Sequence, residues 1–163
     1  MTKKAHENYT VPGLSKIDGH KVGDSLQARL HALNDLHLTL KHAHWNVTGP
    51  NFIAVHEMLD PQVDLVRAMV DEIAERMATM GVSPNGLTAP MAAQLEGDTY
   101  PLGRADSSAH LVALDAVYTR VLEDHRETLD SMGKFDPITE DMLINQISQL
   151  ELFQWFMRSH LGA

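Results

Sequence analysis

The stretch KHAHWNVTGPNFIAVHEMLDPQVDLVRAMVDEIAER, residues 41–76, decides how this chain is expected to fold. Between residues 51 and 80 apolar side chains recur every three or four positions, which is typical of one buried helix face. These positions are Phe52, Val55, Leu59, Val63, Val66, Val70, Ile73, Met77 and Met80. The spacing predicts a long amphipathic helix over 51–80, with a local kink where Pro61 removes an amide donor.

A polar row runs along the same predicted helix. At about 100° per residue its members fall on one side of the cylinder. They are His56, Asp60, Asp64, Arg67, Asp71 and Glu75. A solvated face more often carries Lys and Glu in mixed order, so this row of imidazoles and carboxylates predicts a metal site.

The spacing along the helix axis predicts how that metal site is built. His56 and Asp60 lie one turn apart, as do Asp71 and Glu75, but about 16 Å of helix rise separates Asp60 from Asp71. The ions of a two-metal carboxylate site lie about 3.5–4 Å apart. One copy of the helix therefore cannot bring both pairs to a single centre.

The residue numbers of the two pairs are symmetric about a point between Leu65 and Val66. An antiparallel second copy of the helix, related by a two-fold axis at that point, would bring the first pair of one copy against the second pair of the other. The same axis would set Asp64 of one copy beside Arg67 of the other. We therefore expect a symmetric homodimer with two equivalent metal sites, each built from both copies.

Composition limits the remaining possibilities. A chain of 163 residues with 44% apolar content suits one domain with a full core. The absence of cysteine excludes disulfides, thiolate zinc sites and cysteine nucleophiles, so oxygen and imidazole must hold any metal. The formal charge of −9 favours cations over phosphates as partners. Because no apolar run could span a bilayer and no secretory leader begins the chain, we expect a cytoplasmic protein without membrane contact.

The N-terminal residues 1–23 are predicted to form a flexible, locally basic tail, because their glycines disfavour a stable helix. Its cations are Lys3, Lys4, Lys16 and Lys21. The tail is either a solvated arm or an arm that contacts DNA phosphates. The folded domain then covers residues 24–163, with Asp24 capping the first helix.

The first helix places His37 and His44 on its apolar stripe. His37 is expected to be a core or interface residue, whereas His44, beside Trp45 at the helix end, can be directed at the next helix. Residues 82–106 form a long connection rich in Pro and Gly, with a short helix at Pro90–Glu96. Such connections usually have a purpose.

Two further helices complete the prediction. The third runs from Ser107 or Ser108 to Met132, and the fourth begins near Thr139 as its cap. No strand pattern and no internal repeat stand out. The fold class is therefore all-α, a four-helix bundle with one long crossover.

The runs HAHWNVTGPNFIAVHEMLD (42–60), DEIAER (71–76) and FQWF (153–156) resemble the Dps family, the DNA-binding proteins from starved cells, or mini-ferritins. The resemblance covers nearly the whole chain. It implies a ferritin-like bundle, a hollow dodecamer, and oxidation of Fe(II) at sites shared across the two-fold axis. The implied iron ligands are His44, His56 and Asp60 of one subunit with Asp71 and Glu75 of its neighbour.

The resemblance also implies what the shell does. Hydrogen peroxide is the implied oxidant, with dioxygen as the alternative, and ferric mineral is stored inside while DNA is protected. Trp45 is a candidate trap for stray oxidising equivalents, or it packs the site.

Three acids at the start of the predicted fourth helix, Asp136, Glu140 and Asp141, are candidates for a three-fold pore for iron uptake. Helix capping and the helix dipole explain them equally well. DNA association through the lysine tail is expected to be weak and salt-sensitive, since the C-terminus SHLGA is not basic. Association with the nucleoid is expected only if this DNA binding occurs. Two rival functions use the same ligands, a metal-dependent hydrolase of amides or esters and a passive metal-binding shell.

Overall fold

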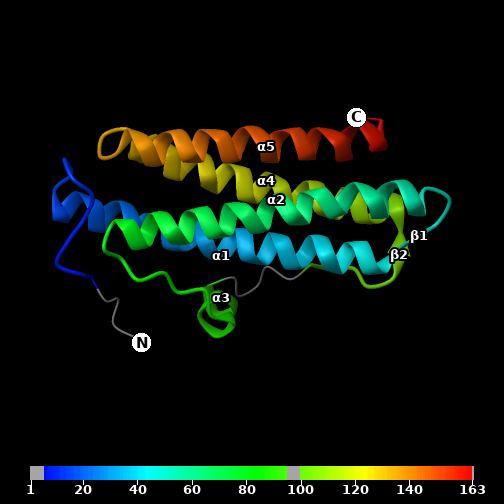
Figure 1. The fold of residues 1–163 in the computed structure, drawn as a ribbon. Helices are drawn as coiled ribbons and strands as arrows, with labels where there is room; N and C mark the ends of the chain where they lie inside the picture. Colours follow the sequence, from blue (N-terminus) through cyan, green and yellow to red (C-terminus); the bar gives the residue numbers. More distant parts are fainter. Residues whose placement is uncertain (1–5, 95–99, 163) are drawn as a thin grey trace.

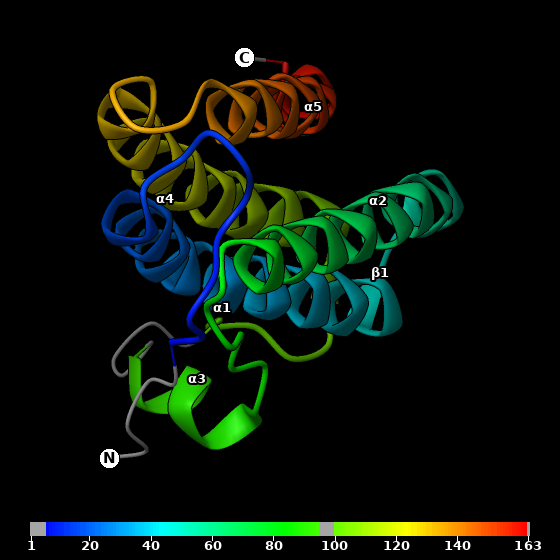
Figure 2. The ribbon, with the colours of Figure 1, turned by 60° about the vertical axis from the view of Figure 1, so that its left-hand side comes forward.

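The structure, a computed structural model, describes residues 6–94 and 100–162. Its bundle consists of the four long helices seen in Figure 1, α1 (Lys16–Asn46), α2 (Phe52–Thr79), α4 (Ser107–Met132) and α5 (Pro137–Leu161). α1 packs along α2, α4 packs along α5, and α1 joins the two pairs by contacting α4. The short helix α3 (Thr88–Gln94) lies outside the bundle, next to α1 (Figure 2). The predicted all-α bundle with one long crossover is confirmed.

Helix α2 is one continuous helix through Pro61. Its predicted apolar stripe is buried from Val55 to Met80, with Val70 half-buried, because those side chains form the core against the other helices. Phe52, at the first turn, is 40% exposed. The continuous helix and its buried face are confirmed, since proline removes one hydrogen bond while burial of the stripe is retained.

The crossover runs from one end of the bundle to the other, as Figure 1 shows. Its end pairs with the chain after α1, because the two-residue strands β1 (Val47–Thr48) and β2 (Ala105–Asp106) form a parallel pair. Thr48 also donates its hydroxyl to the Ala105 carbonyl at 2.9 Å. The sequence showed no strand pattern because two residues are too few to produce a period.

The first helix begins earlier than predicted. Ser15, rather than Asp24, is the N-cap, and its hydroxyl accepts from the Asp18 amide at 3.1 Å. The glycines of this segment are sites of close approach: a Cβ at Gly19 would lie 2.1 Å from the Thr10 hydroxyl, and one at Gly23 would lie 2.6 Å from a Val82 methyl. Glycine here allows two segments to pass each other, which outweighs its helix propensity.

Residues 6–15 lie across the N-terminal end of α1 and the C-terminal end of α2. The Glu7 amide donates to the Gly81 carbonyl at 2.7 Å, and the Tyr9 hydroxyl donates to the Ala78 carbonyl at 3.2 Å. Gly81, with φ of 74°, leaves no room for a side chain, because a Cβ would lie 2.3 Å from the Tyr9 carbonyl oxygen. We call residues 6–15 the N-terminal strap.

Two other element boundaries differ from the prediction. Helix α3 covers Thr88–Gln94 rather than residues 90–96, and Glu96 lies outside the described residues. Helix α5 is capped by Asp136 rather than Thr139, and Pro137 takes the first helical position. Proline is favoured there because its missing amide would have no partner.

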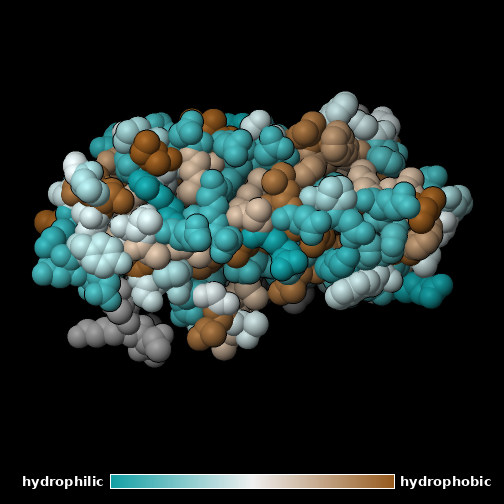
Figure 3. Space-filling model, viewed as in Figure 1, coloured by the Kyte–Doolittle hydropathy of each residue, from teal (hydrophilic) through white to brown (hydrophobic). Residues whose placement is uncertain are grey.

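The face shown in Figure 3 is mostly hydrophilic, with hydrophobic side chains between α2 and α5. Across residues 6–94 and 100–162, none of the helices has the length and apolar character needed to cross a membrane.

Candidate metal centre

Two histidines from neighbouring helices stack at one end of the α1–α2 pair. The rings of His44 and His56 lie 3.6 Å apart between centroids, with 23° between their planes. Each Nδ1 is hydrogen-bonded to the other residue's backbone carbonyl, at 3.0 Å for His44 and 2.9 Å for His56. Because a carbonyl only accepts, each Nδ1 carries the proton in the neutral ring. Each Nε2 is therefore left as the lone pair that can bind a metal.

Asp60 completes this group. One of its carboxylate oxygens lies 3.3 Å from His44 Nδ1 and 2.6 Å from Lys41 Nζ. The hydrogen bond from Lys41, aided by the nearby His44 and His56, holds the pKa of Asp60 below its ordinary value. The carboxylate is therefore ionised at neutral pH and carries the charge that a cation needs.

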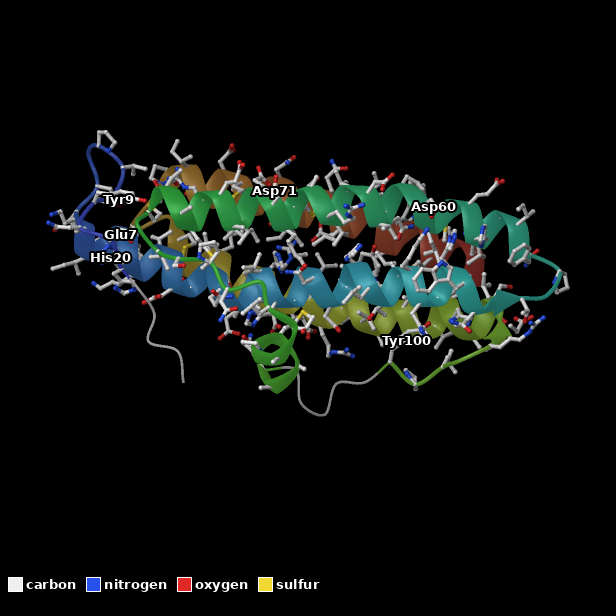
Figure 4. All side chains as sticks on the ribbon, turned by 60° about the horizontal axis from the view of Figure 1, so that its bottom comes forward. Glu7, Tyr9, His20, Asp60, Asp71 and Tyr100 are labelled. Carbon is white, nitrogen blue, oxygen red and sulfur yellow. The ribbon has the colours of Figure 1, made fainter. Side chains whose placement is uncertain are left out.

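Asp71 and Glu75 lie further along the same helix, and Figure 4 shows Asp71 far from Asp60 on α2. Both side chains are exposed and line a groove of about 310 Å³ between α2 and α5. Among the described residues of a single chain, no three His, Cys, Asp or Glu side chains are arranged to hold a metal ion. The chain brings His44, His56 and Asp60 together and leaves Asp71 and Glu75 apart.

The middle of α2 shows which side of the helix is open to a second copy. Val66 is wholly buried in the core of its own chain, so it cannot face a second copy. The exposed side of α2 at this level instead carries Asp64, Arg67 and Asp71, which line a groove of about 470 Å³ between α1 and α2. A second copy would have to approach this side of the helix.

His37 lies in the same groove and not on the buried stripe. Leu36 takes the buried position, and His37 is half-buried. Burial, together with the charges of Arg67 and Lys41, lowers the pKa of His37. The sequence pattern placed His37 on the buried face, where Leu36 lies instead. The error arose because the line of buried residues on α1 rotates gradually around the helix along its length.

Trp45 is 70% exposed and lines a pocket of about 430 Å³ with Val47, Phe52 and Arg104 among others. Most of the Trp45 side chain is therefore open to solvent within one chain. Trp155, in the FQWF run of α5, is also exposed, at 60%.

The three acids at the start of α5 differ in their surroundings. Asp136 is buried, accepts from the Thr139 amide at 3.0 Å, and pairs with Arg76 at 2.5 Å. Burial opposes its ionisation, but the hydrogen bonds from Thr139 and Arg76 outweigh burial and hold its pKa below the ordinary value. Glu140 is half-buried and Asp141 is exposed. The geometry makes Asp136 a helix cap and an ion-pair partner.

Among the predicted DNA contacts, Lys3 and Lys4 lie outside the described residues. Lys16 donates to the Asn8 side chain at 2.6 Å, and Lys21 lies 3.5 Å from Asp18 and 5.4 Å from the centre of the Phe135 ring. Both cations therefore already have partners within the chain.

Sequence reasoning missed Lys41 as a neighbour of the site. Lys41 and Asp60 are 19 positions apart, so no helical spacing relates them. Only the packing of α1 on α2 brings the ammonium group to the carboxylate.

An antiparallel helical bundle with a long crossover and imidazole and carboxylate groups on its helix faces defines the ferritin-like class. The model of the ferritin-like domain family matches residues 23–163. The chain is 51% identical to the DNA protection during starvation protein of Mycolicibacterium smegmatis, over 96% of this chain and 85% of that protein. It is 53% identical to the fine tangled pili major subunit of Haemophilus ducreyi, over 99% of this chain and 86% of that protein.

Solved structures agree with these relatives. DpsA14 from Streptomyces coelicolor superposes with a TM-score of 0.93 at 54% identity, covering 98% of this chain and 95% of that one. The tetragonal form of Mycobacterium smegmatis Dps superposes with a TM-score of 0.92 at 50% identity, covering 95% and 94% of the two chains. The chain therefore belongs to the Dps family of ferritin-like proteins.

Proposed function

We propose that this protein oxidises Fe(II) at sites shared by two copies of the chain, with hydrogen peroxide or dioxygen as the oxidant. The observation that carries the proposal is the pair of hydrogen bonds by which His44 and His56 hold each other and leave both Nε2 lone pairs free. The ionised Asp60 lies 3.3 Å from His44 Nδ1 in the same group. Nitrogen and carboxylate ligands with open positions suit Fe(II).

The second half of each site comes from another copy in this proposal. Asp71 and Glu75 are exposed on α2, about 16 Å of helix rise from Asp60. An antiparallel α2 docked on the groove lined by Asp64 and Arg67 places these carboxylates against the histidine end of its partner. The same docking pairs Asp64 of one copy with Arg67 of the other.

The chemistry follows from a pair of ions held together. The histidines and carboxylates orient two Fe(II) ions and leave positions for peroxide. Two Fe(II) ions supply two electrons, so one hydrogen peroxide and two protons give two waters and two Fe(III) ions. Reduction in one two-electron event avoids release of hydroxyl radical.

The relatives support a role in protecting DNA, since several are named DNA protection during starvation proteins. We propose that the assembly is a shell that stores the ferric product. We place the protein in the cytoplasm as a dodecamer, with Glu140 and Asp141 as the acids of an iron-uptake pore. Its contact with DNA at the nucleoid is weak and salt-sensitive, because Lys16 and Lys21 already have partners within the chain.

A mixed-subunit experiment tests the shared site. Each intact site would take His56 from one copy and Asp71 from the other, so shells made only of His56→Ala or only of Asp71→Asn subunits should lose Fe(II) oxidation. In shells assembled from equal amounts of both variants, about a quarter of the sites combine two intact halves by random pairing. We expect the initial rate of peroxide-dependent oxidation to recover to about that fraction.

Failure of the mixed shells to recover activity would contradict a site built from two copies. Retention of full activity by both single variants would contradict the residue assignment. The same samples separate the rival functions. Metal binding without turnover would indicate a passive shell, and cleavage of an amide or ester lost in the same variants would indicate a hydrolase.

A further inference from the structure

The end of the crossover carries a tyrosine bonded to a buried histidine. The Tyr100 hydroxyl lies 2.8 Å from Nδ1 of His110, and the two rings are nearly parallel, with centroids 5.9 Å apart and 14° between planes. His110 lies in the first turn of α4 and is wholly inaccessible to solvent. Figure 4 shows Tyr100 beneath the C-terminal half of α1.

The surroundings of His110 determine which ring nitrogen accepts. Its Nε2 is buried without a hydrogen-bond partner of good geometry, and the backbone carbonyls of Asn46 and Gly103 nearby favour a protonated ring. In the neutral tautomer that carries its proton on Nε2, Nδ1 accepts the phenolic hydrogen. The alternative acceptor, the His110 carbonyl, lies further from the hydroxyl at 3.4 Å. Burial lowers the pKa of His110, so the ring is a neutral base at pH 7.

The chain has three tyrosines, so the other two can be compared with Tyr100. Tyr9 donates to the Ala78 carbonyl and Tyr118 donates to the Gln62 side-chain oxygen. Neither amide oxygen can hold a proton at neutral pH, whereas the imidazole at Tyr100 can. Burial also raises the pKa of Tyr100, so the phenol stays protonated until it is oxidised.

The pair lies at the same end of α1 as the candidate metal centre. His110 is close to the carbonyl of Asn46, which directly follows Trp45 and lies two residues after His44. His42, one turn back, places its ring edge-on to Tyr100, with 5.8 Å between centroids, and bonds to the Leu102 carbonyl. An oxidising equivalent that escapes from the metal centre would arise close to this pair.

We propose that Tyr100 and His110 form a redox-active pair that takes up a single oxidising equivalent. One electron leaves Tyr100 for a one-electron oxidant, either hydroxyl radical or an oxidised Trp45. The phenolic O–H bond breaks and its proton moves to His110 Nδ1, giving a neutral tyrosyl radical and an imidazolium ion. Reduction by one Fe(II) ion returns the electron, the proton moves back, and Fe(III) is formed. The proposal rests on the proposed ferroxidase function only for the source of the oxidant.

Photochemical oxidation tests the pair without iron. Laser-generated tris(bipyridine)ruthenium(III) would oxidise the assembled protein, and electron paramagnetic resonance of freeze-trapped samples would report the radical. We expect a neutral tyrosyl signal in the unmodified protein that is lost in Tyr100→Phe and retained in Tyr9→Phe and Tyr118→Phe. A failure of Fe(II) oxidation would leave this result unchanged, so the two proposals fail separately.

A second variant separates proton transfer from packing. His110→Asn keeps an oxygen that accepts the phenolic hydrogen bond but cannot take the proton. Because a positioned base contributes about 10²–10⁴-fold to such transfers, we expect Tyr100 oxidation to slow by about 100-fold. A purely structural role predicts no change in this rate.

Spin-trap labelling of the unmodified protein, followed by peptide mass spectrometry, locates the radical without any substitution. An adduct on Tyr100 would support the proposal even if the variants fold poorly. A tyrosyl signal that persists in Tyr100→Phe, an adduct confined to Tyr9 or Tyr118, or His110→Asn oxidised at the unmodified rate would overturn it.

Discussion

Replacing Asp136 by alanine removes one carboxylate that has two structural roles. It caps α5 through the Thr139 amide, at 3.0 Å, and pairs with Arg76, at 2.5 Å. Loss of an N-cap costs about 1 kcal/mol, and breaking a buried ion pair costs about 3–5 kcal/mol. The two costs are not additive, and Arg76 keeps 16% side-chain exposure. We therefore expect the free energy of unfolding to fall by about 3 kcal/mol, near the low end of the ion-pair range.

The assay is thermal unfolding followed by circular dichroism at a fixed protomer concentration, since association adds to apparent stability. For a chain of this length a loss of about 3 kcal/mol lowers Tm by about 6–12 °C. Asp136→Asn should fall between the alanine variant and the unmodified protein, because asparagine also caps helices but carries no charge. The control is Asp141→Ala, an exposed acid in the same helix, for which about 0.5 kcal/mol or less is expected.

The sign of the pH dependence provides a second check. The pKa of Asp136 is lowered in the folded chain, so its contribution to stability is present above the unfolded pKa and is lost as pH falls. Asp136→Asn should remove that part of the acid sensitivity. If Asp136→Ala destabilises by less than about 1 kcal/mol, or only slows iron uptake, the cap and ion-pair argument is refuted and a pore role is favoured.

Three further changes have defined outcomes. Burial lowers the pKa of His125 to about 4 from 6.5, so its contribution is present above pH 6.5 and lost on acidification. Unfolding at about pH 5 and pH 7.5 should show a loss of about 2 kcal/mol that His125→Leu abolishes. Lys41→Met removes the ammonium group 2.6 Å from Asp60 and should tighten Co(II) binding by about tenfold, measured by absorption titration. Gly81→Ala should displace the N-terminal strap from α2, because the new Cβ would lie 2.3 Å from the Tyr9 carbonyl oxygen. Amide hydrogen exchange at residues 6–15 should therefore become faster.

Each of these predictions has a matched control. His110→Leu should leave most of the pH-dependent loss in place, because the buried His125 beside Arg29 is still present. Lys21→Met, remote from the site, should leave Co(II) affinity unchanged. Gly86→Ala meets no atom within 4 Å and should leave amide exchange in the strap as it was. Equal effects of control and test substitutions would contradict the structural reasoning in each case.

Features that depend only on the spacing of residues along one helix could be predicted from the sequence. The apolar rhythm predicted α2 and its buried face, because a side chain's direction around a helix depends only on its position. The same geometry grouped the acids and His56 on one face of α2 and separated Asp60 from Asp71. The N-cap of α5 could also have been predicted, since an aspartate followed by proline is a recognised signal for the start of a helix.

Where the outcome depends on a neighbour distant in sequence, only the tertiary structure decided it. Gly19 and Gly23 indicated a break in the helix, yet they lie inside α1, because Thr10 and Val82 pass too close for a side chain. The burial of Val66 was expected from its place on the apolar stripe, but which side of α2 stays open to a second copy followed only from the packing of the bundle.

The contacts around the candidate sites likewise depend on the tertiary structure and not on the spacing of residues. Lys41 meets Asp60, and Tyr100 meets His110, across turns and a crossover whose course the residue spacing does not determine. Periodicity determines which way a side chain points from its own helix. Which group it meets is determined by packing, because close-packed interiors bring together residues that are far apart along the chain.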